Sequence, residues 1–417
     1  MFEYTPTDWD VRRFGDFATL SSQRFSKKIN APVLSMTKYD GFVKSSEYFK
    51  KQIFSDDISN YKLVKNGEFA YATIHLDEGS IGLLKEFQNG YISPMYTVFK
   101  IDSSVNRDYL LVLMKTQLYL YKYSAIAEGT VDRRKAVKFL DLKNLNIPLP
   151  KIDEQEKIAY ILSSVDNLIQ NTDKLIEKTT RLKKGLVQEL LTRGIGHTKF
   201  KKVNLLPSYI ILHIPDEWES KSLSTIVQIK GRIGWRGYTV NDLRDSGPLV
   251  IGATQISTQH TIDLSNPTYI SKEKYDESPE IQLTEDNILI VKTGNTVGKI
   301  AFIDNTLGDA TINPNVCVLK NIEINTKFLY YTLLTNTIQY LLKIHSLESS
   351  AQPAINQKTI QNLIIPIPPL PEQQQIASIL SNTDEKIQSY RRYKEKLQRL
   401  KKSLMQKLLT GEVRVAV

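Results

Sequence analysis

The segment Thr293-Gly294-Asn295-Thr296-Val297-Gly298-Lys299 lies between the apolar runs NILIV and IAFI. A glycine-bracketed turn that ends in lysine can cradle a phosphate group. It does not match a nucleotide-binding P-loop, because its G-x-x-x-G-K spacing is one residue short and Ile300 replaces the magnesium-binding Ser or Thr. The following apolar run also predicts a strand instead of a helix. We expect a hairpin or strand connection that approaches a phosphate backbone, or a tight turn with a solvated lysine.

Other polar residues hold comparable places in the chain. The segment that corresponds to this loop in the N-terminal half carries Asp77 and Glu78, and its glycines are spaced differently. Candidate contacts there and before two predicted helices are Thr73, Ser80, Lys85, Arg133, Arg134, Lys135, Gln352 and Asn356. Asparagine and glutamine amides suit adenine, and arginine suits guanine. The alternative for each residue is helix capping or loop solvation.

Catalytic and metal-binding patterns are missing from the sequence. The five histidines have no H-x-x-x-H or H-E-x-x-H spacing, and Cys317, the only cysteine, lies in the strand-like run NVCVLK. Asn313-Pro314-Asn315-Val316 is a poor match to an Asn-Pro-Pro-aromatic methyltransferase tetrad, and no nucleophile elbow or clustered acid pair is found. We expect neither catalysis, a metal nor a cofactor in this chain.

An internal repeat organises the chain. The segment from Ile147 matches the segment from Ile365, with a shift of 218 residues and no gaps. Roughly half of the aligned positions are identical, which composition alone does not produce. Within each copy, apolar residues recur every three or four positions, as in a helix with a coiled-coil seam. The predicted seam residues are Ile158, Leu162, Val165, Ile169, Ile176, Leu182, Leu186, Ile376, Leu380, Ile387, Leu397 and Leu404.

The repeat predicts two long helices, over about residues 153–191 and 371–409. Pro150 and Pro371 mark their starts, and Gly194 and Gly411 mark their ends. Each helix would be roughly 55 to 60 Å long at 1.5 Å per residue, so it needs a partner along its length. We pair the helices with each other, antiparallel about a pseudo-two-fold axis, so that the C-terminus returns to the first domain. Docking of each seam on another protein is the alternative. Basic residues late in both helices are expected to be solvated, with contact to phosphate or to a partner as the alternative. They are Arg181, Lys183, Lys184, Arg399, Lys401 and Lys402.

The segment before each long helix reads as a mixed α/β domain, with β-branched and aromatic runs between turn residues. We therefore predict an α/β (α+β) architecture. Residues 1–147 and 203–365 form the globular domains, and residues 148–202 and 366–417 form the helices. The formal charge of +10 and the pI near 9.2 fit a partner rich in phosphate. No apolar stretch approaches the ~20 residues of a membrane span, and no leader peptide is evident, so we expect a cytoplasmic protein.

The run IP-x-P-x-x-x-EQ-x-x-I-A-x-I-L-S, followed by R-L-K-K-x-L-x-Q-x-L-L-T, occurs in both copies and resembles type I restriction-modification specificity subunits. The T-G-N-T-V-G-K loop with INPNV is similar to the recognition-domain pattern of that family. The resemblance implies a non-catalytic subunit that reads a bipartite target in double-stranded DNA, one half-site per domain, with a spacer set by the helices. It also implies two modification (methyltransferase) subunits that bind S-adenosylmethionine, and restriction subunits that use ATP and magnesium.

The T-G-x-x-x-G-K loop is absent from the first domain, which leaves the contact residues of that domain open. The competing interpretation of the whole chain is a coiled-coil adaptor or scaffold that does not contact DNA.

Overall fold

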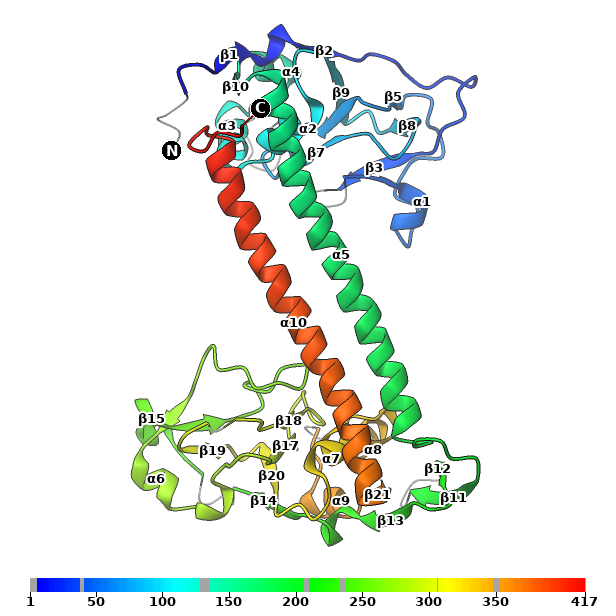
Figure 1. Ribbon diagram of the computed structural model, residues 1–417, viewed down its shortest axis with the longest axis vertical. Helices are drawn as coiled ribbons and strands as arrows, with labels where there is room; N and C mark the ends of the chain where they lie inside the picture. Colours follow the sequence, from blue (N-terminus) through cyan, green and yellow to red (C-terminus); the bar gives the residue numbers. More distant parts are fainter. Residues whose placement is uncertain are drawn as a thin grey trace. The chain divides into compact units, whose positions relative to one another are not determined.

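The computed structural model describes residues 6–37, 41–127, 136–205, 210–232, 237–305, 307–347 and 353–416. The chain divides into two compact units. Unit 1 comprises residues 1–173 and 392–417, and unit 2 comprises residues 174–391. Two helices of 39 residues each, α5 (Ile152–Leu190) and α10 (Leu370–Leu408), contribute one half to each unit (Figure 1). The mixed helix and sheet architecture is therefore as predicted.

Unit 1 is built on a four-stranded sheet with the order β2-β9-β6-β7. Its neighbouring strands are all antiparallel. The core lies between this sheet and the helices that follow it, where the rings of Phe69 and Phe99 stack with centroids 4.9 Å apart. The elements of unit 1 before α5 are β1 (Asp10–Arg13), β2 (Ala18–Leu20), β3 (Leu34–Thr37), β4 (Gly41–Lys44), α1 (Ser45–Tyr48), β5 (Lys62–Lys65), β6 (Phe69–Ala72), β7 (Ile81–Leu83), β8 (Asn89–Ile92), β9 (Tyr96–Ile101), α2 (Arg107–Met114), α3 (Gln117–Ile126), α4 (Phe139–Lys143) and β10 (Asn146–Leu149).

Unit 2 repeats this plan with a sheet of order β14-β20-β17-β18, and it adds a three-stranded sheet β16-β15-β19. Continuous apolar runs such as β17 are fully buried, with core side chains on both faces. The elements of unit 2 between α5 and α10 are β11 (Phe200–Leu205), β12 (Ile210–Pro215), β13 (Glu219–Ser222), β14 (Gln228–Gly231), β15 (Leu243–Ile251), β16 (Tyr269–Ile270), α6 (Lys272–Asp276), β17 (Ile288–Val291), β18 (Ile300–Phe302), β19 (Ala310–Ile312), β20 (Val316–Lys320), α7 (Thr326–Leu333), α8 (Asn336–Ser346), α9 (Gln357–Gln361) and β21 (Ile364–Ile367).

The two units share more than their sequences suggest. In each, the described residues after the central sheet form three helices and one strand, which leads into a long helix. That last strand pairs antiparallel with a strand near the start of the same unit, β10 with β1 and β21 with β13. Each long helix is thereby joined to both the beginning and the end of its domain.

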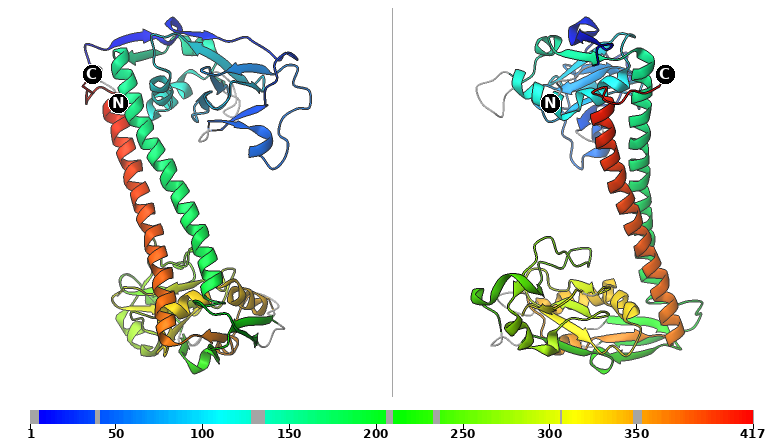
Figure 2. Two further views of the ribbon diagram at one scale, coloured as in Figure 1. Left: turned by 45° about the vertical axis from the view of Figure 1, so that its right-hand side comes forward. Right: turned by 60° about the vertical axis from the view of Figure 1, so that its left-hand side comes forward.

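Helices α5 and α10 lie side by side and run antiparallel (Figures 1 and 2). Three ion pairs define their register. In unit 1, Asp166 pairs with Lys401 at 2.5 Å, and seven residues further along α5, Asp173 pairs with Lys394 at 2.6 Å, seven residues back along α10. In unit 2, Lys183 pairs with Asp384 at 2.6 Å. A shift of 218 residues exchanges Asp166–Lys401 with Asp384–Lys183, as the predicted pseudo-two-fold symmetry requires.

Burial along the helices follows a heptad seam. The buried seam residues are Ile158, Leu162, Val165, Ile376, Leu380, Ile387 and Leu397, whereas Ile169, Ile176, Leu186 and Leu404 are half-buried. The prediction that Leu182 belongs to the seam is wrong, since its side chain is 58% exposed. It follows Ile176 by six residues, whereas seam positions recur at three, four or seven. Leu182 instead continues an exposed strip with Leu168 and Leu175 at seven-residue spacing.

Most of the late basic residues are exposed, as expected, namely Arg181, Lys184, Arg399 and Lys402. Lys183 and Lys401 differ from that expectation, since both are half-buried. The side chains of Lys183 and Lys401 are 23% and 30% exposed, and both ammonium groups form ion pairs between the helices. Periodicity could not show this, because the matching carboxylates lie on the other helix.

The Glu-Gln pair that opens each repeat copy is a buried junction. In unit 1, Gln155 accepts a hydrogen bond from the Asn106 N–H and donates one to the Pro150 carbonyl, both 2.8 Å long. In unit 2, Gln373 does the same with Asn325 and Pro368, again at 2.8 Å. Asn106 and Asn325 cap the equivalent helices α2 and α7. Each glutamine therefore fixes a long helix to the helices of its domain.

The glutamate beside it anchors the chain that leaves the other long helix. Arg414 binds Glu154 through two hydrogen bonds of 2.7 Å in unit 1. Glu372 accepts hydrogen bonds from the Ile195 N–H, His197 and the Trp218 indole in unit 2. The end of each long helix is thus tied to the start of its partner, and the C-terminal segment lies in unit 1, as predicted.

We predict that replacing Gln373 by alanine lowers the free energy of unfolding of unit 2 by about 2 to 4 kcal/mol, since two buried groups lose their partner at about 1–3 kcal/mol each. Gln375→Ala is the matched control, because Gln375 is exposed on the same helix. Denaturant titration of the full-length variants measures both values. Equal stabilities for the two variants would refute the role of Gln373.

Candidate nucleic-acid interface

The glycine-bracketed loop of unit 2 is a hairpin between β17 and β18. A strand follows it, which agrees with the rejection of a P-loop. Its base is fixed by backbone hydrogen bonds, from the Lys292 N–H to the Asn315 carbonyl and from the Gly294 N–H to the Pro353 carbonyl. Thr293 adds a side-chain hydrogen bond of 3.0 Å to the amide oxygen of Asn315. The hairpin therefore rests on the INPNV segment and on the chain that leads to α9.

The side chains of this hairpin serve different purposes. Asn295 is exposed at its tip, and Thr296 is half-buried. Gly298 has a φ of +88°, a conformation that favours glycine. Lys299 is half-buried, and its ammonium donates a 2.8 Å hydrogen bond to the Ile256 carbonyl. Lys299 therefore ties the hairpin to a neighbouring loop of its own domain.

His260 also forms a hydrogen bond with this hairpin. Its Nδ1 lies 3.2 Å from the N–H of Ile300, the first residue of β18. Burial lowers the pKa of the His260 ring, so the neutral ring can accept this hydrogen bond. The hairpin is thus held by interior hydrogen bonds on both of its arms.

The corresponding hairpin of unit 1 joins β6 to β7. Thr73 lies at its start, where its hydroxyl donates to the Met95 carbonyl at 3.1 Å, and Ser80 is buried at its end. Gly79 has a φ of +88°, the same value as Gly298. The tip is acidic, and Glu78 pairs with His75 at 3.1 Å. Lys85 lies beyond β7, where it forms an ion pair with Asp108.

The remaining sequence candidates are only partly described. Asn356 is the N-cap of α9 and accepts hydrogen bonds from the Thr359 N–H at 2.7 Å and from its hydroxyl at 3.0 Å. This geometry is that of a helix cap, the alternative to a DNA contact for this residue. Gln352, Arg133, Arg134 and Lys135 lie outside the described residues.

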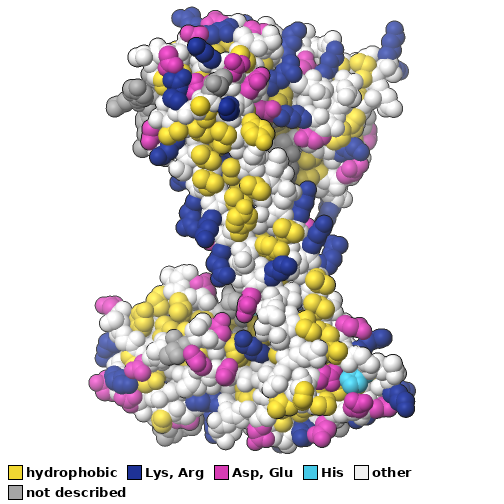
Figure 3. Space-filling view, viewed as in Figure 1, with side chains coloured by type: hydrophobic (Ala, Val, Ile, Leu, Met, Phe, Trp, Pro, Cys, Tyr) yellow, Lys and Arg dark blue, Asp and Glu magenta, His cyan; other side chains and the backbone are white. Residues whose placement is uncertain are grey.

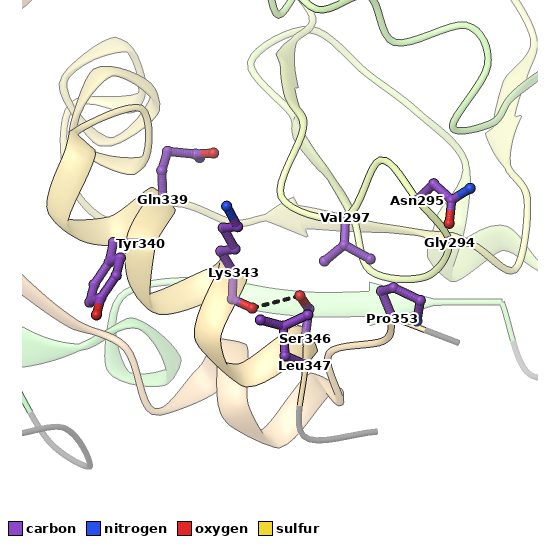
Figure 4. Close-up of a pocket in the computed structure, with 9 residues that line it drawn as sticks. All are labelled: Gly294, Asn295, Val297, Gln339, Tyr340, Lys343, Ser346, Leu347 and Pro353. Atoms are coloured by element: carbon purple, nitrogen blue, oxygen red, sulfur yellow. Dashed lines mark hydrogen bonds between the residues drawn. The ribbon is translucent and has the colours of Figure 1, made fainter. Parts of the chain in front are cut away.

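A groove between the unit 2 hairpin and α8 was not predicted (Figure 4). It has a volume of about 400 Å³. Its hairpin wall carries Gly294, Asn295 and Val297, and its helix wall carries Gln339, Tyr340 and Lys343. Helix α8 is amphipathic in sequence, so its outward face gave no signal of a binding surface.

Within the described ranges, no group of three or more metal-ligating side chains could hold an ion. No described helix is long and apolar enough to cross a membrane.

Comparisons with known proteins divide the chain into two halves, as the structure does. The family described as type I restriction modification DNA specificity domain matches residues 6–181 and 215–399, once in each half of the chain. The type I restriction enzyme MjaVIII specificity subunit of Methanocaldococcus jannaschii is 27% identical, over 98% of this chain and 94% of that protein. The putative MjaX specificity subunit of the same organism is 28% identical, over 98% and 95%.

Among solved structures, the type I restriction-modification S subunit from M. genitalium shares the fold, with a TM-score of 0.61 and 16% identity over 98% of both chains. A type I restriction-modification structure described for its complex assembly and conformational transition has a TM-score of 0.54, with 18% identity over 98% of this chain and 99% of that one. The family match spans most of the sequence and repeats with the two units. The chain therefore belongs to the type I restriction-modification DNA specificity family, whose members recognise DNA and are not themselves catalytic.

Proposed function

We propose that this chain reads a bipartite target in double-stranded DNA, with one half-site for each globular domain. The observation that carries the proposal is the repetition of one plan in both units, the same sheet order, the same hairpin and the same junction to a long helix. The domains of this proposal are residues 1–147 and 203–365, and the spacer segments are residues 148–202 and 366–417. An adaptor without DNA contact would have no need of two such hairpins in a DNA specificity family.

Within each domain we propose the hairpin as the surface that approaches DNA. In unit 2 the contacts would come from Thr293, Gly294, Asn295, Thr296 and Gly298, with Asn295 as the side chain best exposed for base reading. Lys299 and Asn356 would act through the positions of the segments that they hold. In unit 1 the contacts would come from Thr73, Lys85 and the basic run Arg133, Arg134 and Lys135. Ser80 is buried, so it would act through the position of the hairpin.

We further propose two modification subunits as partners, together with restriction subunits. S-adenosylmethionine, ATP and magnesium would be bound by those partners and not by this chain, and the complex would work in the cytoplasm. Hydrophobic side chains are visible over the helix pair in Figure 3. The exposed strip of Leu168, Leu175 and Leu182 gives α5 an apolar face outside its seam, which suits docking of a partner helix.

Replacement of residues 203–365 by the same segment of another specificity subunit should change one half of the recognised sequence and leave the other half intact. Each domain makes its own sheet and core, so each should read independently. Methylation mapping in cells that carry the hybrid and its modification subunits gives both half-sites. Changes in both halves would contradict two independent readers.

The helix pair makes a second prediction about spacing. Removal of residues 170–176 together with residues 391–397 takes one heptad from each helix at the level of the Asp173–Lys394 pair. The pairs Asp166–Lys401 and Lys183–Asp384 then keep their register. The helices shorten by about 10 Å, and the spacer between half-sites should shorten by about three base pairs at 3.4 Å each.

Deletion of residues 170–176 alone is the control, because it puts the ion pairs on its two sides out of register. This variant should lose stable pairing of its helices. The complex that contains it should therefore methylate targets with neither the original nor the shortened spacer. An unchanged spacer in the double deletion would remove the proposal that the helices set the distance.

A further inference from the structure

An exposed tyrosine occupies the same position beside the hairpin in both units. Tyr121 in α3 is 72% exposed, and Tyr340 in α8 is 55% exposed. Each is the fifth residue of its helix, and each helix follows an equivalent threonine N-cap, Thr116 or Thr335. The glycine with a φ of +88° in each hairpin faces the residue just before the tyrosine, Leu120 near Gly79 and Gln339 near Gly298.

Contacts within the protein do not explain why a tyrosine stands at these two positions. Within the described part of the chain, the hydroxyl groups of Tyr121 and Tyr340 have no hydrogen-bond partner. By contrast, Tyr119 and Tyr123 of the same helix α3 are buried and donate to the carbonyls of Asn146 and Met114. The domains differ in sequence at most surface positions, so the recurrence of an exposed aromatic donor at one equivalent point indicates a shared external contact.

The side chains of the groove in unit 2 indicate what kind of molecule makes that contact. Lys343 lies on α8 three residues after Tyr340, and in Figure 4 its side chain projects into the space between α8 and the hairpin. The ammonium of Lys343 has no anionic partner among the described residues. None of the nine residues lining the groove is acidic. Gln339 is already engaged, since its amide donates to the Leu333 carbonyl at 2.9 Å.

We infer that Tyr121 and Tyr340 are a matched pair of contacts to the DNA phosphodiester backbone, one in each recognition domain, and that Lys343 binds a phosphate in the groove beside Tyr340. A phenol hydroxyl and an ammonium are both common donors to phosphate oxygens. The occupant of the groove is thus a DNA strand held by its backbone, and these contacts position the hairpin without reading the sequence. The inference rests on the proposed function.

The test uses the full-length chain and several duplexes of defined, unrelated sequence, and the affinity for each duplex is measured over a range of salt concentrations. Lys343→Gln should lower the slope of log affinity against log salt by about 0.9, the value for one phosphate contact. Tyr340→Phe and Tyr121→Phe should each weaken binding by about five- to tenfold, with the slope unchanged, because each loses one hydrogen bond. Controls are Tyr160→Phe, whose ring is also 72% exposed but lies on α5, and Lys386→Gln on α10.

Losses that are equal across sequences, absent from the controls and present for both tyrosines support the inference. It is overturned if the three variants match their controls, if only one tyrosine matters, or if the losses depend on the base sequence. Absence of salt-dependent binding by the wild-type chain would instead overturn the proposed function, and this inference with it.

Discussion

The antiparallel pairing of two copies of one helix is the interaction on which the rest of the structure depends. A helix of 39 residues cannot hide its apolar seam inside a small domain, and its own repeat offers the complementary surface. The ion pairs add direction to this surface, because Asp166 and Asp384, in the first half of each helix, meet lysines late in the other helix. Hydrophobic burial drives the pairing, and the charges select one register.

Side-chain contacts at both ends of the helix pair connect the helices to the globular domains and to the segments that follow them. Gln155 and Gln373 connect each long helix to the domain before it, and Glu154 and Glu372 hold the segment that leaves the opposite helix. Since these glutamines and glutamates sit inside the repeated segment, the repeat preserves the helix side of both junctions, although the partners of Glu154 and Glu372 differ. The globular parts are free to differ in their hairpins and added sheets without disturbing that frame.

Much of this architecture could be predicted from sequence. The long helices begin and end within one residue of the predicted positions, because apolar periodicity, prolines and glycines all point to the same limits. Leu182 was misplaced because a leucine at an approximate interval resembles a seam residue until its burial is known. The hairpin was recognised as a strand connection, but the anchoring of Lys299 to Ile256 depends on a loop 43 residues away in sequence. Tyr121 and Tyr340 carried no signal of their own, since their equivalence appears only when the two folded units are compared.

Chemical cross-linking of cysteine pairs tests the central claim most directly. Cys317 is fully buried, so introduced cysteines react without background from it. With a short bis-maleimide, the pair Asp166→Cys and Lys401→Cys should cross-link within one chain. The pair Asp166→Cys and Asp384→Cys, which occupies equivalent positions of the two repeat copies, should not. Cross-linking of the second pair and not the first would mean parallel helices, and cross-links formed only between chains would mean that the seams do not pair within one molecule.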